Sequence, residues 1–236
     1  MTRHIGALLP ATNTTIETEY SRLPQDVLQF HYARCDKGGG SPFHPSKDED
    51  VAYQSKMLGK ARVEVIGLIQ TSASLFEDGY DARVKTLITD NSGIPALTSA
   101  EAIGAAAKAL GVKRVAIVTP YSTEVIERAA AYYRTGFGLE AAALEAFQAT
   151  DAYAIFSLGA ENATAAFERL DSPEVEAFIV PGGNFQTMPH IEGWEKQFGK
   201  PVIATNPALV WASMNLLGIT DRMPGLGRLL AEMPKG

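Results

Sequence analysis

Four short turns hold most of the residues in this chain that could do chemistry together. They are PATNTT at 10–15, QTSAS at 70–74, TPYST at 119–123 and PGGNFQT at 181–187. Each turn follows an apolar run, and together they offer hydroxyls, amides and backbone N–H groups with almost no charge. Such groups suit a small anion that is held by many neutral donors. The turns therefore predict a site for a small anionic ligand.

The segments that must position these turns alternate between strand-like and helix-like patterns. Short apolar runs rich in β-branched residues start at Ile5, Leu28, Val63, Arg114, Ala177 and Pro201. Between them lie helix-length segments such as SAEAIGAAAKALG, which Ser99 can cap and Gly111 can end. Continuous apolar strands separated by amphipathic stretches are typical of a parallel sheet that is covered on both faces. The predicted fold class is α/β.

The two halves of the chain resemble each other. HIGALLPATNTTIETEY is similar to RVAIVTPYSTEVIERAA, and VEVIGLIQTSAS is similar to VEAFIVPGGNFQ. GIPALTSAEAIGAAAKALGV is likewise similar to GKPVIATNPALVWASMNLLGI. The offset in the three pairs is roughly 105 to 112 residues, about half the chain, as expected for an internal duplication. The sequence therefore predicts two related α/β halves.

We expect two pseudo-symmetric, Rossmann-like halves with parallel sheets. The first comprises residues 1–98 with 220–236, and the second comprises residues 99–219. Ligands of such sheets bind beyond the carboxyl ends of the strands. The four turns follow predicted strands, so we expect the active-site cleft between the two halves.

Composition narrows the classes of function. The chain has 236 residues, of which 46% are hydrophobic, and this is enough to bury a core. Its net charge of −6, without a dense Lys/Arg run, gives no electrostatic reason to bind nucleic acid or an acidic membrane. The start, MTRHIGALLP, lacks the longer apolar segment of a signal peptide, and no run approaches the roughly 18 apolar residues of a membrane span. We expect a cytoplasmic protein that acts on a small molecule.

Two of the turns carry a resemblance to a known family. QTSASLFEDGYDARV is similar to the segment of arylmalonate decarboxylase that holds a malonate carboxylate through a Thr-Ser pair, here Thr71 and Ser72. VAIVTPYSTEVIERAAAY is similar to the segment whose tyrosine, here Tyr121, contributes to the same oxyanion pocket. The chain thus resembles the aspartate/glutamate racemase superfamily, to which this decarboxylase and maleate cis-trans isomerase belong.

Other segments extend the resemblance over nearly the whole chain. PATNTT is closer to the isomerase, whose asparagine at this turn, here Asn13, touches the substrate. PVIATNPALVWASMNLLG, followed by PGLGRLL, is similar to the C-terminal end of both enzymes. The resemblance implies an enzyme that acts on a small carboxylate without metal or cofactor. It also implies a homodimer.

The resemblance also shows what this chain lacks. In the superfamily the two facing turns usually carry one cysteine each, and those positions fall at Gln70 and Pro181 here. The racemases need both thiols, the isomerase needs a thiolate nucleophile, and the decarboxylase keeps only the second thiol, which protonates a carbanion. This chain has neither.

The loss of both thiols affects the possible reactions unequally. Two-base racemisation needs an acid and a base on opposite faces of one carbon, and covalent isomerisation needs a nucleophile. Decarboxylation depends chiefly on an apolar place for the departing carboxylate and on donors that stabilise the enediolate. We therefore expect a cofactor-independent lyase that decarboxylates a small malonate-like dicarboxylate. Its catalytic residues would be Tyr121, Thr71 and Ser72, with water or Tyr121 as the proton source.

Substrate-binding residues are expected in the same turns. They are Asn13, Gln70, Pro181, Gly182, Gly183 and Asn184. Two other functions stay open. One is cis-trans isomerisation of a small dicarboxylic acid, or hydrolysis of such an acid's cyclic amide. The other is ligand binding without catalysis, by a family member that lost its thiols.

Three further residues could replace a thiol if they reached the cleft. Cys35 ends the second strand-like run, and we interpret this lone cysteine as a buried core residue. His44 lies in the loop from Gly38 to Pro45, which could close over a ligand, and His190 follows the PGGNFQT turn. We interpret both histidines as surface residues.

Overall fold

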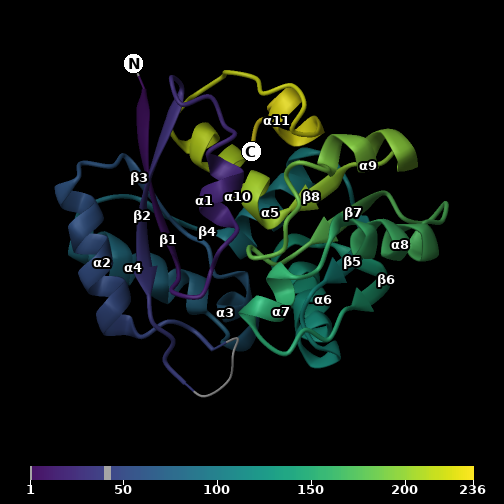
Figure 1. Cartoon of the computed structure of the whole chain (residues 1–236), viewed down its shortest axis with the longest axis horizontal. Coiled ribbons are helices and arrows are strands. Elements are labelled where there is room, and N and C mark those ends of the chain that lie inside the picture. The colour runs from purple at the N-terminus through teal and green to yellow at the C-terminus, as the bar shows by residue number, and fades with distance from the viewer. Residues whose placement is uncertain (1, 40–43) are drawn as a thin grey trace.

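The chain forms two parallel β-sheets that lie side by side in the computed structural model (Figure 1). The structure describes residues 2–39 and 44–236. In this part of the chain the first sheet has the order β2-β1-β3-β4 and the second the order β6-β5-β7-β8. The strands are β1 (Arg3–Pro10), β2 (Leu28–Cys35), β3 (Val65–Leu68), β4 (Ala96–Thr98), β5 (Arg114–Thr119), β6 (Glu140–Ala146), β7 (Ala177–Val180) and β8 (Val202–Ala204). The predicted α/β class with two similar halves is confirmed.

Helices cover both sheets. They are α1 (Ile16–Tyr20), α2 (Asp48–Lys60), α3 (Thr71–Phe76), α4 (Tyr80–Ser92), α5 (Ser99–Ala109), α6 (Thr123–Phe137), α7 (Ala152–Phe156), α8 (Ala160–Leu170), α9 (Ile191–Phe198), α10 (Thr205–Leu216) and α11 (Arg228–Glu232). Helices α2 and α4 pack together on the first sheet, and α6 and α8 contact β5 and β6 of the second. No helix among the described residues is long and apolar enough to cross a membrane.

The apolar runs predicted as strands all form strands, but β4 and β6 were not predicted. β4 has only three residues, and the short run ALT carries little pattern. β6 has the sequence EAAALEA, and alanine and glutamate favour helices. Its residues alternate between exposed and half-buried along an edge strand, so its pairing with β5 decides its structure.

The cap of α5 differs by one residue from the prediction. Thr98, rather than Ser99, is the N-cap, and its hydroxyl accepts a hydrogen bond from the Glu101 N–H. Ser99 becomes the first residue of the helix and is buried. Gly111 has φ +72°, a left-handed backbone that glycine adopts readily, and so the helix ends where predicted.

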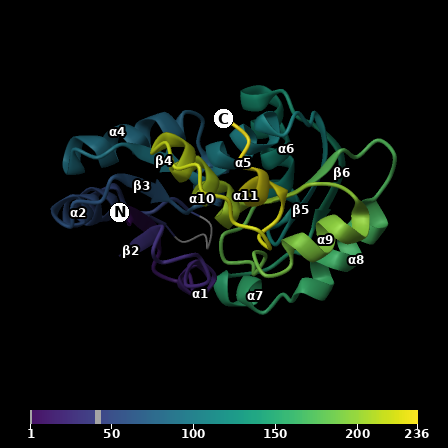
Figure 2. The ribbon, with the colours of Figure 1, turned by 90° about the horizontal axis from the view of Figure 1, so that it is seen from above.

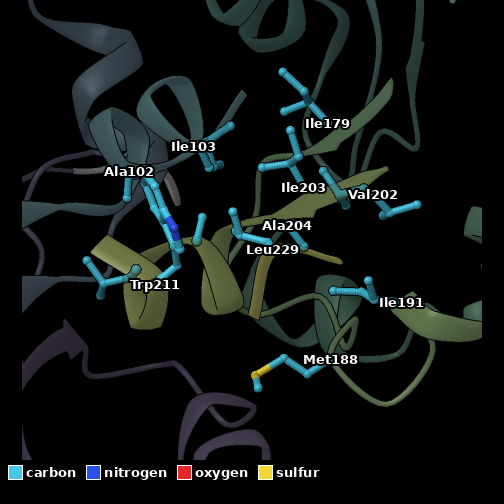
Figure 3. Close-up of a cluster of buried hydrophobic side chains, with 14 of the residues drawn as sticks. Ala102, Ile103, Ile179, Met188, Ile191, Val202, Ile203, Ala204, Trp211 and Leu229 are labelled. Atoms are coloured by element: carbon cyan, nitrogen blue, oxygen red, sulfur yellow. The ribbon is translucent and has the colours of Figure 1, made fainter. Parts of the chain in front are cut away.

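Helices α5 and α10 join the two halves. Each follows the last strand of its half, and they pack against each other; α10 also contacts β3 and β4, and α5 contacts β8 (Figure 2). Figure 3 shows Trp211 of α10 beside Ala102 of α5, within one hydrophobic cluster that includes strands of both sheets. This shared core fixes the halves relative to each other, and so it fixes the turns between them.

The C-terminal residues contact elements outside the first sheet. The Arg228 N–H donates to Glu195 of α9 at 2.7 Å, and the Trp211 indole N–H donates to the Pro234 carbonyl at 2.9 Å. The predicted boundary between residues 98 and 99 falls between β4 and α5. The grouping of residues 220–236 with the first half stays a prediction, while these hydrogen bonds run to α9 and α10.

Candidate active site

The four turns meet at a small cavity between the halves, with a volume of about 50 Å³. Seven of the nine predicted site residues line it: Asn13, Gln70, Thr71, Ser72, Tyr121, Gly183 and Asn184. Pro181 and Gly182 are buried and are not among the lining residues. These seven residues follow the carboxyl ends of strands, and parallel strands place these ends at one edge of each sheet.

Thr71 lies in a cluster of three buried hydroxyl groups. Its Oγ1 atom is 2.9 Å from Ser99 Oγ and 3.2 Å from Thr205 Oγ1. Ser99 and Thr205 are the first residues of α5 and α10, so the duplication supplies both partners. The cluster ties the start of α3 to both halves and leaves Thr71 with a fixed orientation.

Ser72 and Tyr121 bring two hydroxyl groups from opposite halves together. Burial raises the pKa of the Tyr121 hydroxyl, and a hydrogen bond from Ser72 partly offsets this rise. Tyr121 is 5% exposed. The phenol therefore stays neutral at ordinary pH and keeps its O–H as a hydrogen-bond donor. A neutral donor of this kind suits an oxyanion that develops during a reaction.

Asn13 and Asn184 hold the two longest turns against each other. Asn13 Oδ1 accepts from the Ile16 N–H at 3.1 Å, and its Nδ2 donates to the Gly183 carbonyl at 3.3 Å. Asn184 Oδ1 accepts from the Thr14 N–H at 2.8 Å. Both residues line the cavity, but the hydrogen bonds that the structure shows run to other groups of the protein. Their predicted contacts with substrate stay predictions.

Gln70 uses its side-chain amide to hold a neighbouring segment. Its Nε2 donates to the His44 carbonyl at 2.8 Å, and its Oε1 accepts from the Ser46 N–H at 3.1 Å and from the Ser46 hydroxyl at 2.9 Å. The residue is 5% exposed. An amide can be neither acid nor base at neutral pH. At the position where the superfamily usually has a cysteine, this chain therefore has a residue that binds a neighbouring segment.

The register of the sheets shows that the two superfamily cysteine positions, Gln70 and Pro181, are not exact counterparts in the two halves. β3 ends at Leu68 and β7 ends at Val180, and each pairs in the same way with the central strand of its sheet. Gln70 is two residues beyond β3. The residue two beyond β7 is Gly182, one position after Pro181. Gly182 is therefore the equivalent of Gln70 in the second half.

Backbone geometry leaves no room for a side chain at Gly182. Its φ is +144°, which L-residues rarely adopt, and a Cβ atom there would lie 2.8 Å from Pro120 Cγ. Its N–H donates to Thr205 Oγ1 at 2.8 Å. At Gly183 a Cβ atom would lie 2.9 Å from Ile69 of the other half. The glycines thus allow the second turn to pack closely, and the turn presents backbone.

The three residues that could have replaced a thiol do not line the cavity. Cys35 is fully buried in the core of the first half, and burial, followed by the nearby Asp50, raises the pKa of its thiol to about 12. Its interpretation as a core residue is confirmed. His44 is exposed, and His190 is the N-cap residue of α9. Of the predicted closing loop, residues 40–43 lie outside the described residues.

Lys37 lines the cavity and was not predicted. It lies two residues after the end of β2, at the same edge of the sheet as the other site residues. Burial lowers the pKa of its ammonium group, and Asp151 and Asp36 act in the opposite direction. Lys37 could have been recognised in the sequence because it lies just beyond a strand-like run. It was assigned instead to the glycine- and proline-rich loop that follows.

The described residues hold no cluster of three or more His, Cys, Asp or Glu side chains that could bind a metal ion. The fold and the cavity define a class of protein: a duplicated α/β chain with a candidate small-molecule site between its halves. Within this class, the model of the arylmalonate decarboxylase family matches residues 45–230. The chain belongs to that family.

Individual relatives extend this result to both ends of the chain. Maleate isomerase of Alcaligenes faecalis is 29% identical, with 98% of this chain and 97% of the relative covered. Arylmalonate decarboxylase of Bordetella bronchiseptica is 28% identical, with 97% and 96% covered. A solved structure of Nocardia farcinica maleate cis-trans isomerase is 26% identical, with a TM-score of 0.86 and 98% and 99% covered. The superfamily resemblance predicted from the sequence is confirmed, and these relatives are enzymes.

Proposed function

We propose that this protein is a cofactor-independent decarboxylase of a small malonate-like dicarboxylate. The observation that carries the proposal is the meeting of Thr71, Ser72 and Tyr121 at one cavity that no thiol lines. These hydroxyl groups suit the charge that develops when a carboxylate leaves, and the reaction needs no nucleophile from the protein.

The cavity offers different surroundings to the two carboxylates of such a substrate. Ile69 and Ile155 contribute apolar surface, which favours loss of charge from the departing carboxylate as carbon dioxide. Ser72 and Tyr121 contribute hydroxyl groups for the carboxylate that stays. The electron pair of the broken C–C bond enters the enediolate of this remaining carboxylate. A proton from water then adds to the α-carbon.

A thiol-based isomerisation has less support. The solved Nocardia farcinica isomerase is a cysteine-to-serine mutant with a covalently bound succinylcysteine intermediate. A comparable adduct here would need Cys35, the one cysteine of the chain. This side chain is buried outside the cavity and its raised pKa disfavours the thiolate, which is the nucleophilic form.

Isomerisation remains the second candidate because maleate isomerase of Alcaligenes faecalis is 29% identical to this chain. It would have to proceed without a thiol adduct. A water molecule activated in the cavity is the alternative nucleophile, and the same arrangement would permit hydrolysis of a cyclic amide.

The size of the cavity points to a compact substrate. One water molecule needs roughly 10–15 Å³ of such volume, so about 50 Å³ corresponds to only a few water molecules. A methyl-substituted malonate fits this space better than one with a phenyl group. We expect methylmalonate to be decarboxylated faster than phenylmalonate.

Proton NMR in heavy water tests the reaction directly. The purified protein is mixed separately with methylmalonate, phenylmalonate, maleate and maleamate. Carbon dioxide release with one deuterium at the α-carbon supports the decarboxylase. Conversion of maleate to fumarate supports the isomerase instead. Binding of these acids without any product would contradict both and support a non-catalytic ligand-binding role.

The oligomeric state is a separate proposal. We propose a homodimer, as the resemblance to the superfamily implies. Sedimentation velocity at micromolar concentration measures it, and a monomer there would contradict it.

A further inference from the structure

Lys37 gives the cavity its charge. Among the described residues that line the cavity, it is the one with a charged side chain. The other polar side chains that line the cavity are neutral and include the hydroxyls and amides of Ser72, Tyr121 and Asn13. In a partly buried site, a single cation attracts an anion more strongly than it would in water. The charge therefore favours a ligand with a carboxylate at this side of the cavity.

The segment that carries Lys37 is held by Gln70. Lys37 and Ser46 form an antiparallel bridge, and the Gly38 N–H donates to the Pro45 carbonyl at 2.8 Å. The Ser46 N–H and hydroxyl both donate to Gln70 Oε1. Gln70 thus fixes the strand partner of Lys37. The residue at the position of the first superfamily cysteine positions the segment that carries the cation.

The acidic neighbours of Lys37 have other partners as well. Asp36 and Asp151 both favour the charged form of the lysine. Asp36 accepts from Lys47 Nζ at 2.7 Å, and Asp151 caps α7 by accepting from the Ala154 N–H at 2.8 Å. These two carboxylates stabilise the ammonium group while they bond elsewhere. A substrate carboxylate would add to these favourable interactions with the charge of Lys37.

We propose that Lys37 recognises a carboxylate of the substrate, so that the site selects small dicarboxylate dianions over monoanions of the same shape. Gln70 is a positioning residue for this contact. The inference rests on the proposed function, since it identifies the charge state of the acid that the same cavity binds. Maleate and maleamate form a suitable pair of probes because they share a carbon skeleton and differ by one charge.

Calorimetric titration of Lys37→Met with both probes tests the assignment. The wild type should bind maleate more tightly than maleamate. Lys37→Met should bind maleate about ten-fold or more weakly, since a charge-assisted contact is lost, and should bind maleamate within about three-fold of the wild type. Lys56→Met is the matched control, because Lys56 is exposed on α2 and does not line the cavity. It should leave both affinities unchanged.

Each outcome separates this inference from the proposed function. An unchanged ratio of the two affinities in Lys37→Met overturns the role of Lys37, whatever the reaction is. Binding that depends on Lys37, without any product by NMR, supports the inference and contradicts the decarboxylase. A wild type that binds neither maleate nor methylmalonate overturns both.

A double-mutant cycle tests Gln70 as a positioning residue. Gln70→Ala should lower the preference for maleate over maleamate. In the Lys37→Met background the same substitution should change the preference by less than about two-fold, because residues that act through one contact are not additive. Equal effects in both backgrounds would mean that Gln70 acts on the protein generally, and would overturn its positioning role.

Discussion

The two equivalent turns at the cavity differ in what they present to it. The turn that begins at Gln70 contributes the side chains of Gln70, Thr71 and Ser72. The turn at 181–187 contributes Gly183 and Asn184 to the lining. At Gly182 and Gly183 a Cβ atom would approach the neighbouring atoms to within 3 Å, so these two positions present backbone. A duplicated fold has therefore given rise to an asymmetric site. Any chemistry that needs matched acid and base groups on the two turns is excluded by this difference.

The second half still contributes one reactive side chain, Tyr121, and its removal should have the largest effect. Tyr121→Phe removes the buried O–H that would stabilise the enediolate. Loss of one such donor lowers turnover by about 10²–10³-fold, and we expect at least ten-fold here. Thr71→Ala, from the first half, should also lower turnover by about ten-fold or more. Steady-state rates of carbon dioxide release measure both.

Tyr133→Phe is the matched control for Tyr121→Phe. Tyr133 is fully buried in α6, and its hydroxyl has no hydrogen-bond partner in the described structure. Removal of an unsatisfied hydroxyl should leave turnover within about two-fold and stability unchanged or slightly raised. Full activity of both Tyr121→Phe and Thr71→Ala would contradict the decarboxylase and would remove the chemical difference between the two turns.

Substitution of Gly182 tests whether the second turn can carry a side chain at this position. Gly182→Ala places a Cβ atom against Pro120 at φ +144°, and strain of this kind costs about 1–3 kcal/mol of the free energy of unfolding. For a chain of this size we expect the melting temperature to fall by about 2–4 °C per kcal/mol. Differential scanning calorimetry measures the fall.

Gly136→Ala provides the opposite control. Gly136 is exposed near the end of α6, does not have positive φ, and would have no atom within 4 Å of an added Cβ. Alanine there should raise stability by about 0.5–1 kcal/mol, because glycine disfavours a helix. A Gly182→Ala variant as stable as Gly136→Ala would show that the second turn could carry a side chain after all.

The sequence predicted the class of fold well because the signal is local. Six apolar runs of strand length were found where six strands lie, since buried parallel strands are continuous and β-branched. The edge strand β6 was missed because its alanines and glutamates favour a helix, and its pairing with β5 is a tertiary effect.

The site was predicted less completely because its decisive contacts are distant in sequence. Asn13 was expected to touch substrate, yet its side chain reaches Gly183, 170 positions away. Lys37 was missed because its place at the cavity depends on the hydrogen bonds between Ser46 and Gln70, 24 positions apart. The types and spacing of residues in the sequence show which residues follow strands. They do not show how a loop packs against the rest of the site.

The one thiol of the chain, Cys35, gives the smallest expected effect among these tests of the difference between the two turns. Cys35 lies in the first half but outside both turns, and its pKa rises from an ordinary 9.0 to about 12 in the folded protein. Above about pH 9 the unfolded chain loses this proton and the folded chain keeps it. Stability should therefore fall as pH rises from 9 towards 12, by about 1.4 kcal/mol per pH unit, and should not change through Cys35 below pH 8.

Urea unfolding of the wild type and Cys35→Ala at pH 8, 9 and 10 isolates this contribution. The difference in free energy of unfolding between them should shrink as pH rises, while turnover of Cys35→Ala stays within about two-fold of the wild type. Parallel pH dependences would mean that the thiol is accessible in the folded state. A loss of turnover in Cys35→Ala would mean that the Cys35 thiol takes part in the reaction. The difference between the two turns would then no longer explain the chemistry.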